Sequence, residues 1–241
     1  MNAQTETYKQ VSLVTGAAGG LGAAIVKELT RRGWRVAAGW HRKSVAASED
    51  VLPVPLNVTS EESVKGAVEL VTAKWGRVDL LVNNAGLTIN ETLLKTSDED
   101  WERVMDVNLR GAFLLSKAIV RAMLKQRSGH IINISSFAAR SGPRGQVAYA
   151  SAKAALIGFT QALAKEGGSR NVQANVILPG VMPTEMTASL SEEVMTAFAE
   201  ANALGRINDV AEVARFIAAL AEMKNISGQV FQLDSRIAPW T

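Results

Sequence analysis

Seven short, almost continuously apolar segments recur along the chain, and longer segments with helical spacing separate them. Strands exposed on one face alternate apolar and polar residues, whereas strands covered on both faces are apolar nearly throughout. The pattern therefore predicts buried strands at 11–16, 35–40, 51–56, 78–83, 130–135, 172–178 and 228–233.

Apolar residues at helical spacing predict a helix that starts after Gly20 and four further helices, at 60–75, 98–126, 147–167 and 209–222. Strands that alternate with helices indicate βαβ units. We therefore expect an α/β protein with a single-domain Rossmann fold, that is, a doubly wound seven-stranded parallel sheet with helices on both faces. Because no linker or repeat interrupts the pattern, we expect one catalytic domain over residues 1–241.

Composition narrows the classes of function. The chain has 241 residues, of which 47% are hydrophobic and 20% are charged, as in a globular protein. It has no cysteine and no long apolar run, so we expect no disulfide, no metal site, no membrane span and a cytoplasmic location. The net charge of +3, without a basic stripe, does not indicate nucleic-acid binding and suits small acidic ligands.

A glycine-rich turn joins the first predicted strand to the first helix. In "TGAAGGLG", Gly16, Gly20 and Gly22 let the backbone approach a ligand closely, and the following helix points free N–H groups at it. This arrangement is typical of a dinucleotide pyrophosphate site. The alternative is a tight turn that serves packing alone.

The end of the second predicted strand bears on the choice of cofactor. An acidic residue there would bind the adenosine ribose 2′-hydroxyl and select NAD. The sequence instead has His41, Arg42 and Lys43, which suit a 2′-phosphate. We therefore expect NADP(H) rather than NAD(H), although a solvated basic loop has the same composition.

Polar residues also end the fourth strand, in "NNAG" at 83–86. Ligands of open parallel sheets bind at the carboxyl ends of the strands, so these amides are candidates for cofactor contacts. An Asx turn that merely stops the strand would look the same.

Tyr149 and Lys153 stand four residues apart in an otherwise small and apolar helical segment, so they share one helix face. A free phenol has a pKa of about 10, and a nearby ammonium should lower it towards the range of a general acid. Ser136 ends a strand close to this helix and could bind a substrate carbonyl. Asn108, amid apolar helical residues, could hold a water that leads to the lysine. Each residue taken alone could equally be an ordinary packing residue.

Taken together, these motifs resemble the short-chain dehydrogenase/reductase family, from about residue 10 to 233. T-G-x-x-x-G-x-G falls on Thr15–Gly22, N-N-A-G on Asn83–Gly86, and P-G-x-x-x-T on the segment from Pro179 to Thr184. The resemblance implies hydride transfer between a nicotinamide and a carbonyl, in a homotetramer or dimer. It implies that the catalytic residues are Asn108, Ser136, Tyr149 and Lys153. The cofactor-binding residues that it implies are Thr15, Gly16, Gly20, Leu21, Gly22, His41, Arg42, Lys43, Asn57, Val58, Asn83, Ala85, Gly86, Tyr149, Lys153, Pro179, Gly180, Met182 and Thr184.

Within the family the chain is most similar to 3-oxoacyl-acyl-carrier-protein reductases and acetoacetyl-coenzyme A reductases. That similarity implies NADPH-dependent reduction of a 3-oxoacyl thioester, with Tyr149 as the acid. It also implies that an acidic carrier protein docks on Arg127 and Arg170. Two alternatives stay open: a dehydrogenase acting on a simple alcohol, sugar or steroid, and an NADP(H)-binding regulator without catalysis. The complete Ser136, Tyr149 and Lys153 set argues against the second.

Several positions depart from the pattern of these reductases. Gly19 stands where an arginine often holds the 2′-phosphate, and Pro183 stands where a polar residue is common. The C-terminal "LDSRIAPWT" lacks the usual D-G-G and adds Arg236 and Trp240, so we expect an altered subunit contact or pocket edge. Helical spacing over 184–205 predicts a lid over the substrate.

Overall fold

The computed structural model describes residues 8–237, which form a seven-stranded sheet in which all neighbouring strands are parallel. The order is β3-β2-β1-β4-β5-β6-β7. The strands are β1 (Val11–Val14), β2 (Arg35–Trp40), β3 (Val51–Pro55), β4 (Leu80–Asn83), β5 (Gly129–Ile134), β6 (Val172–Leu178) and β7 (Val230–Gln232). The expected doubly wound α/β fold is confirmed, and each predicted strand is present within a few residues of its expected bounds. The edge strands β3 and β7, however, are mostly only partly buried, because each has a neighbouring strand on one side alone.

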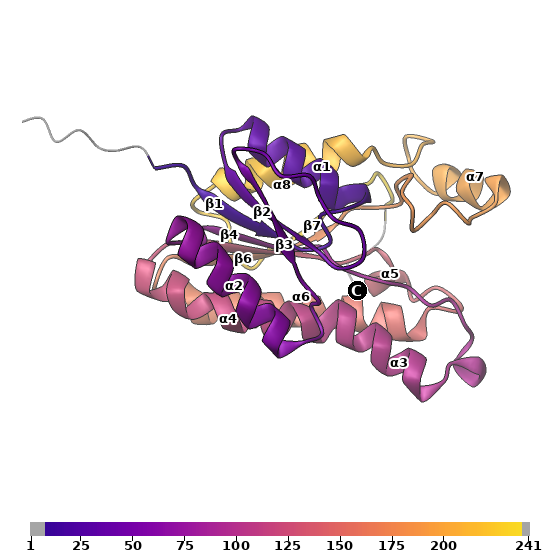
Figure 1. The fold of residues 1–241 in the computed structure, drawn as a ribbon. Helices are drawn as coiled ribbons and strands as arrows, with labels where there is room; N and C mark the ends of the chain where they lie inside the picture. The colour runs from indigo at the N-terminus through magenta and orange to yellow at the C-terminus, as the bar shows by residue number, and fades with distance from the viewer. Residues whose placement is uncertain (1–7, 238–241) are drawn as a thin grey trace, which may run out of the picture.

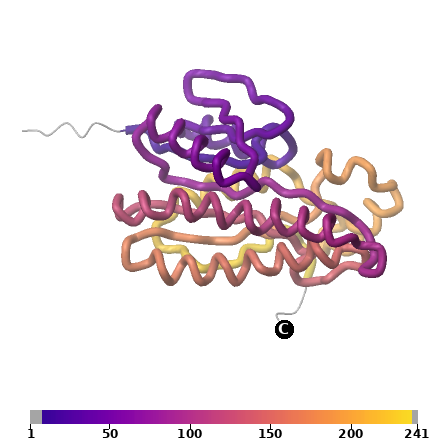
Figure 2. The backbone as a smooth tube through the Cα atoms, turned by 60° about the horizontal axis from the view of Figure 1, so that its bottom comes forward, coloured from indigo at the N-terminus to yellow at the C-terminus, as the bar shows by residue number. Residues whose placement is uncertain are grey.

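Helices cover both faces of this sheet (Figure 1). One layer holds α1 (Gly20–Arg31) and α8 (Val210–Glu222), and the other holds α2 (Glu61–Trp75), α4 (Gly111–Gln126) and α6 (Val147–Gly168). Figure 2 brings the second layer forward and shows α4 and α6 running side by side.

Two apolar cores lie between the sheet and these layers. In β1, Val14 packs into the core on the α1 and α8 side, whereas its neighbour Leu13 packs into the core on the α2 and α4 side. Both side chains are fully buried. Because successive side chains of a strand point to opposite faces, a sheet with two cores needs apolar residues at nearly every position. This explains the continuous apolar segments of the sequence.

The predicted helix at 98–126 is interrupted. It consists of α3 (Asp98–Met105), a π-helical turn η2 (Asp106–Arg110) and α4. The hydroxyl of Ser97 caps α3 by accepting a hydrogen bond from the Asp100 N–H, as the acidic start of this segment predicts. The π turn contains Asn108, and such turns often occur at functional sites.

The predicted helix at 184–205 is much shorter in the structure. Only α7 (Glu192–Glu200) is helical, and residues 184–190 form turns and bends. No residue of α7 is buried, and α7 projects beyond the sheet at the right of Figure 1. Two short elements were not expected from the sequence: the 3₁₀ turn η1 (Leu93–Lys95) and α5 (Ala138–Ser141).

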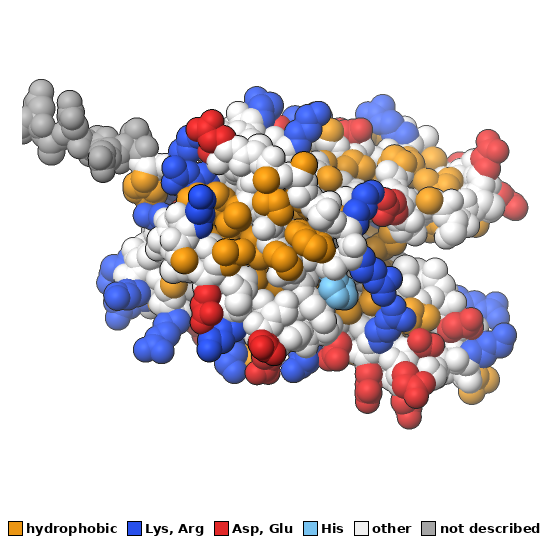
Figure 3. Space-filling view, viewed as in Figure 1, with side chains coloured by type: hydrophobic (Ala, Val, Ile, Leu, Met, Phe, Trp, Pro, Cys, Tyr) orange, Lys and Arg blue, Asp and Glu red, His pale blue; other side chains and the backbone are white. Residues whose placement is uncertain are grey.

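The sheet has its switch point between β1 and β4, because the chain builds outward from β1 to β3 and then returns to the other side. Ligands of open α/β sheets bind at this point, outside the carboxyl ends of the strands. Figure 3 shows that edge of the molecule notched between two projections, which Figure 1 identifies with α7 and α3. Among residues 8–237, no helix is both long and apolar enough to cross a bilayer.

Candidate active site

The glycine-rich turn after β1 has the geometry of an anion cradle. Gly16 and Gly20 have φ values of +63° and +48°, which favour glycine, and a Cβ on Gly22 would overlap the carbonyl oxygen of Gly16. α1 begins at Gly20 without a side-chain cap and without an acidic residue in its first turn. Its first N–H groups are therefore oriented as a phosphate-binding helix start requires. The turn fits a dinucleotide pyrophosphate.

Thr15 and Asn84 hold this turn against the end of β4. The hydroxyl oxygen of Thr15 accepts hydrogen bonds from the N–H groups of Asn84 and Ala85, at 2.9 and 2.8 Å. The side-chain amide of Asn84 donates to the carbonyl oxygens of Thr15 and Gly16. The bracing of the glycine turn by Asn84 was not predicted from the sequence. The position of Asn84 directly after Asn83, at the end of the predicted strand, could have indicated this role.

Asn83 itself is buried, with 6% of its surface exposed. Its side-chain nitrogen donates to Asn133 Oδ1 at 2.8 Å and to Ser116 Oγ at 3.3 Å. Asn133 in turn donates to Thr160 on α6 at 2.9 Å. This ladder of polar groups joins α4, β4, β5 and α6 through the middle of the sheet, so the structure gives Asn83 an internal bracing role.

Three predicted cofactor contacts have side chains that belong to the cores. Leu21, Val58 and Met182 are at most 9% exposed, and Val58 packs against Gly111 at the start of α4. Any contact that they make with a dinucleotide must therefore come from their backbone. The neighbouring Asn57 uses its side-chain oxygen to accept from the N–H and hydroxyl of Thr59.

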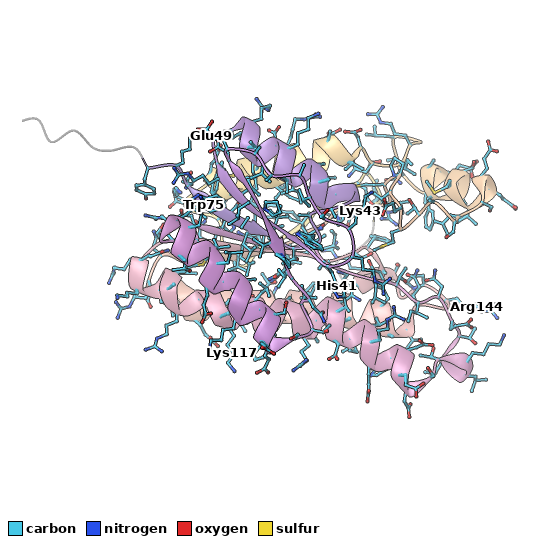
Figure 4. All side chains as sticks on the ribbon, in the orientation of Figure 1. His41, Lys43, Glu49, Trp75, Lys117 and Arg144 are labelled. Atoms are coloured by element: carbon cyan, nitrogen blue, oxygen red, sulfur yellow. The ribbon has the colours of Figure 1, made fainter. Side chains whose placement is uncertain are left out.

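The basic residues after β2 are on the surface at the same edge of the sheet. His41, Arg42 and Lys43 are exposed, and Figure 4 shows His41 and Lys43 on the face towards the viewer, beyond β2. Lys43 Nζ lies 3.7 Å from a carboxylate oxygen of Glu185. Glu185 was not expected at this place, because only the path of the chain after β6 brings it here.

Tyr149 and Lys153 lie on one face of α6, as their spacing predicts. Lys153 Nζ is 5.6 Å from the centre of the Tyr149 ring and donates to the carbonyl oxygen of Ile134 at 2.8 Å. Ser135 Oγ donates to the carbonyl oxygen of Lys153 at 2.7 Å, so the end of β5 fixes this part of α6. Lys153 is 4% exposed, and Tyr149 is partly exposed.

The electrostatics of this pair differ from the expectation. Although the Tyr149 side chain is not fully buried, desolvation raises its pKa above the usual value, and the nearby Ser136 side chain only partly opposes that shift. Burial also lowers the pKa of Lys153 to about 8. The prediction of a lowered Tyr149 pKa is therefore wrong, because desolvation is the largest influence on both groups.

Ser136 follows β5 and meets the start of α6, as its distance from Tyr149 along the chain predicts. Its oxygen accepts a hydrogen bond from the Ala138 N–H at 3.1 Å. The Ser136 side chain is also close enough to Tyr149 to influence the pKa of its phenol, so two hydroxyl groups lie near each other at the carboxyl edge of the sheet. Two hydroxyls in this arrangement can hydrogen-bond one carbonyl oxygen.

Asn108 lies behind this pair, in the π turn. Its side-chain nitrogen donates to the carbonyl oxygens of Leu87 and Val104, at 2.8 and 2.9 Å. Its side-chain oxygen is buried and accepts no hydrogen bond from the described residues. A Cβ on Gly86 would lie 2.9 Å from that oxygen and 3.4 Å from Lys153 Nζ. The absence of a side chain at Gly86 thus leaves room where Asn108 and Lys153 converge.

The segment after β6 approaches the glycine turn. Gly180 has a φ of +80°, and Asn208 fixes the preceding Pro179 by donating to its carbonyl oxygen at 2.7 Å. A Cβ on Gly20 would lie 3.3 Å from the Thr184 side chain. The hydroxyl of Thr187 accepts a hydrogen bond from the Thr184 N–H and donates one to the Met182 carbonyl oxygen, and these two bonds order the turn.

Two other predicted features lie elsewhere. Arg127 ends α4 and Arg170 precedes β6, so both exposed side chains are at the amino edge of the sheet, opposite Tyr149. Arg236 lies against Phe137, the residue after Ser136, whereas Trp240 lies outside the described residues. Within residues 8–237, no cluster of three His, Asp or Glu side chains is placed to hold a metal ion.

Comparison with known proteins agrees with this geometry. The profile of the short chain dehydrogenase family matches residues 10–195. The 3-oxoacyl-[acyl-carrier-protein] reductase of Synechocystis is 40% identical over an alignment 240 residues long, and the match covers 95% of this chain and 97% of that protein. The reductases of the same name from Vibrio cholerae and Thermotoga maritima are each 40% identical and cover 93% of this chain and 96% of their own lengths. The chain is therefore an oxidoreductase that belongs to the short-chain dehydrogenase family.

Proposed function

We propose that this protein reduces a 3-oxoacyl thioester to the 3-hydroxyacyl thioester with NADPH. The observation that carries the proposal is Tyr149 beside the buried Lys153 on α6, held by the end of β5 next to Ser136, at the edge of the sheet that also holds the glycine turn. The names of the relatives support the substrate class, since they are called 3-oxoacyl-acyl-carrier-protein reductases.

The proposed cofactor is NADP(H), which supplies the hydride to the carbonyl carbon. The N–H groups at the glycine turn and the start of α1 hold its pyrophosphate. His41, Arg42 and Lys43 hold its 2′-phosphate, and no acidic residue stands among these three to bind a free ribose 2′-hydroxyl. Lys153 and the segment from Pro179 to Thr184 hold the nicotinamide end.

In the proposed mechanism, Ser136 and Tyr149 hydrogen-bond the carbonyl oxygen of the substrate. Tyr149 would give its proton to that oxygen as the carbonyl group is reduced, so that the ketone becomes an alcohol. The raised pKa of Tyr149 keeps the phenol protonated at neutral pH, as an acid must be. Lys153, with a pKa of about 8, then passes a replacement proton to the phenolate.

Asn108 completes this path by holding a water molecule beside Lys153. The buried and unpartnered side-chain oxygen of Asn108 supports this assignment, because buried polar groups normally find a partner. Its nitrogen is already engaged by two carbonyl groups, which fixes the oxygen towards Lys153. Asn108 is thus proposed to position the water rather than to react.

An acidic carrier protein is the proposed partner at Arg127 and Arg170. These arginines lie about one length of α6, roughly 30 Å for 20 residues, from Tyr149. A carrier docked there would reach a crevice only if a second copy of the chain presented its own crevice nearby. The proposed carrier docking therefore requires that the chain form a dimer or tetramer, which we also propose. A cytoplasmic location is a separate prediction.

The test is a turnover assay with the purified chain. We expect NADPH to be oxidised faster than NADH with acetoacetyl thioesters, and both to react slowly with simple ketones, sugars and steroids. Preference for one of the latter would replace the substrate class but keep the chemistry. Tight NADPH binding without turnover of any carbonyl would identify a non-catalytic binder. Charge reversal of Arg127 and Arg170 should raise KM for the carrier-linked substrate and leave the coenzyme A-linked one unchanged.

A further inference from the structure

Glu185 brings a carboxylate to the part of the crevice that is proposed to receive the cofactor phosphates. A Cβ on Gly19, inside the glycine turn, would lie 3.3 Å from the Glu185 carboxylate. The preceding residue, Thr184, packs over Gly20 in the same turn. The segment after β6 therefore reaches across the crevice and places a negative charge beside the glycine turn.

The same carboxylate pairs with one of the three basic residues after β2. Lys43 Nζ lies 3.7 Å from Glu185, and their side chains are 72% and 81% exposed. Figure 3 shows basic and acidic side chains next to one another at this rim, close to where Figure 4 labels Lys43. A pair this exposed is weak, so a ligand with a higher charge can displace one partner from it.

We propose that Glu185 is a specificity-determining residue that competes with the cofactor 2′-phosphate for Lys43. The proposal rests on the proposed function, in which Lys43 contributes to the 2′-phosphate site. A 2′-phosphate carries close to two negative charges, so it is repelled by the nearby carboxylate and must take Lys43 from it. NAD(H) has a hydroxyl at this place and meets neither obstacle, so Glu185 reduces the preference for NADP(H) over NAD(H).

Gly19 contributes to the same proposed effect on cofactor preference. A longer side chain there would enter the space in which the Glu185 carboxylate lies, whereas glycine leaves that space to Glu185. The charge of the site is therefore set by a residue about 140 positions away from Lys43 in the sequence, and the residues around β2 alone do not determine it.

The test compares dissociation constants of NADP⁺ and NAD⁺ for the wild type and for Glu185→Gln, measured by binding titration without substrate. We expect the ratio of the NAD⁺ constant to the NADP⁺ constant to rise about three- to tenfold in Glu185→Gln at low ionic strength, and less in about 1 M salt. Glu49→Gln is the matched control, because it removes the same charge at the opposite end of β2 (Figure 4) and should leave the ratio unchanged.

The Lys43→Gln variant distinguishes competition between Glu185 and the 2′-phosphate for Lys43 from direct repulsion between Glu185 and the 2′-phosphate. In that background Glu185→Gln should change the ratio less than in the wild type, because Lys43 is no longer there to be released. An equal change in both backgrounds would overturn the competition, and a ratio that Glu185→Gln does not alter would overturn the whole inference. Failure of the wild type to bind either dinucleotide would instead overturn the proposed function, and this inference with it.

Discussion

The guanidinium carbon of Arg236 lies 3.7 Å from the centre of the Phe137 ring. Phe137 directly follows Ser136 in the chain. Arg236 Nε also donates to an oxygen of Asp234 at 2.6 Å, and these two side chains are only 10% and 2% exposed. Asp234 packs against Gly180 so closely that a Cβ there would lie 2.7 Å from it. The unusual C-terminal segment thus braces both Phe137, the residue after Ser136, and the turn after β6.

Replacing Arg236 with Ala should strongly destabilise the protein. The change removes the ion-pair partner of the buried Asp234 carboxylate and leaves it only neutral donors, among them Gln232 Nε2 at 2.7 Å. Loss of one partner of a buried ion pair costs about 3–5 kcal/mol. Urea unfolding measures the effect. Arg236→Lys should be intermediate, because it keeps the charge but loses the flat stacking surface on Phe137. Lys65→Ala, at an exposed ion pair, is the control and should change stability little. A similar loss for both Ala variants would contradict the bracing role.

Replacing Tyr149 with Phe should separate binding from chemistry. The ring remains on α6, so the dissociation constant of NADP⁺ should stay within a few-fold of the wild type. Under the proposed mechanism the change removes the proton donor, so kcat for the proposed 3-oxoacyl thioester substrate should fall by about 10²–10⁴-fold or more. Single-turnover kinetics with NADPH measures the chemical step directly. Turnover close to that of the wild type would remove Tyr149 as the acid.

The sequence revealed those parts of the site that are determined locally. The glycine turn, the pairing of Tyr149 with Lys153 and the alternation of strands and helices all follow from spacing within one or two elements. The seven parallel strands could be predicted because a sheet covered on both faces must be apolar at nearly every position.

Other features depend on the path of the chain in three dimensions. The π turn at Asn108 adds one residue to a helical turn, which apolar periodicity cannot distinguish from a continuous helix. Glu185 reaches Lys43 only through the turns after β6. The direction of the Tyr149 pKa shift was mispredicted because it depends on burial, and burial is set by tertiary packing rather than by the four-residue spacing to Lys153.

Replacing Lys153 with Met should abolish reduction and change the pH dependence of stability. Burial lowers the pKa of Lys153 from 10.5 to about 8, so between these values the unfolded chain binds more protons than the folded one. The contribution of Lys153 to the free energy of unfolding therefore increases by up to about 3 kcal/mol as pH rises from 8 to 10.5. The same contribution disappears when the pH is lowered from 10.5 to 8. Urea unfolding at pH 7.5 and pH 10 should show a larger increase for the wild type than for Lys153→Met. Equal increases would mean that Lys153 titrates normally.

His130 should make the fold sensitive to acid. It lies buried in β5, and its Nε2 is 2.9 Å from the side-chain nitrogen of Asn175, which requires that Nε2 carry no proton. Burial, with a smaller contribution from Lys224, lowers the pKa of His130 from 6.5 to about 4. Below pH 6.5 the unfolded chain gains a proton that the folded chain does not bind until about pH 4. The stabilisation is therefore complete above pH 6.5 and declines as pH falls to 4, by up to about 3 kcal/mol.

Replacing His130 with Gln tests this, because Gln keeps a hydrogen-bond acceptor for Asn175 but does not titrate. We expect the urea midpoint of the wild type to fall more between pH 7 and pH 4.5 than that of His130→Gln. The matched control is His41→Gln, at the other histidine of the chain, which is exposed and should follow the wild type. Parallel declines in all three proteins would show that carboxylates, rather than His130, govern unfolding in acid.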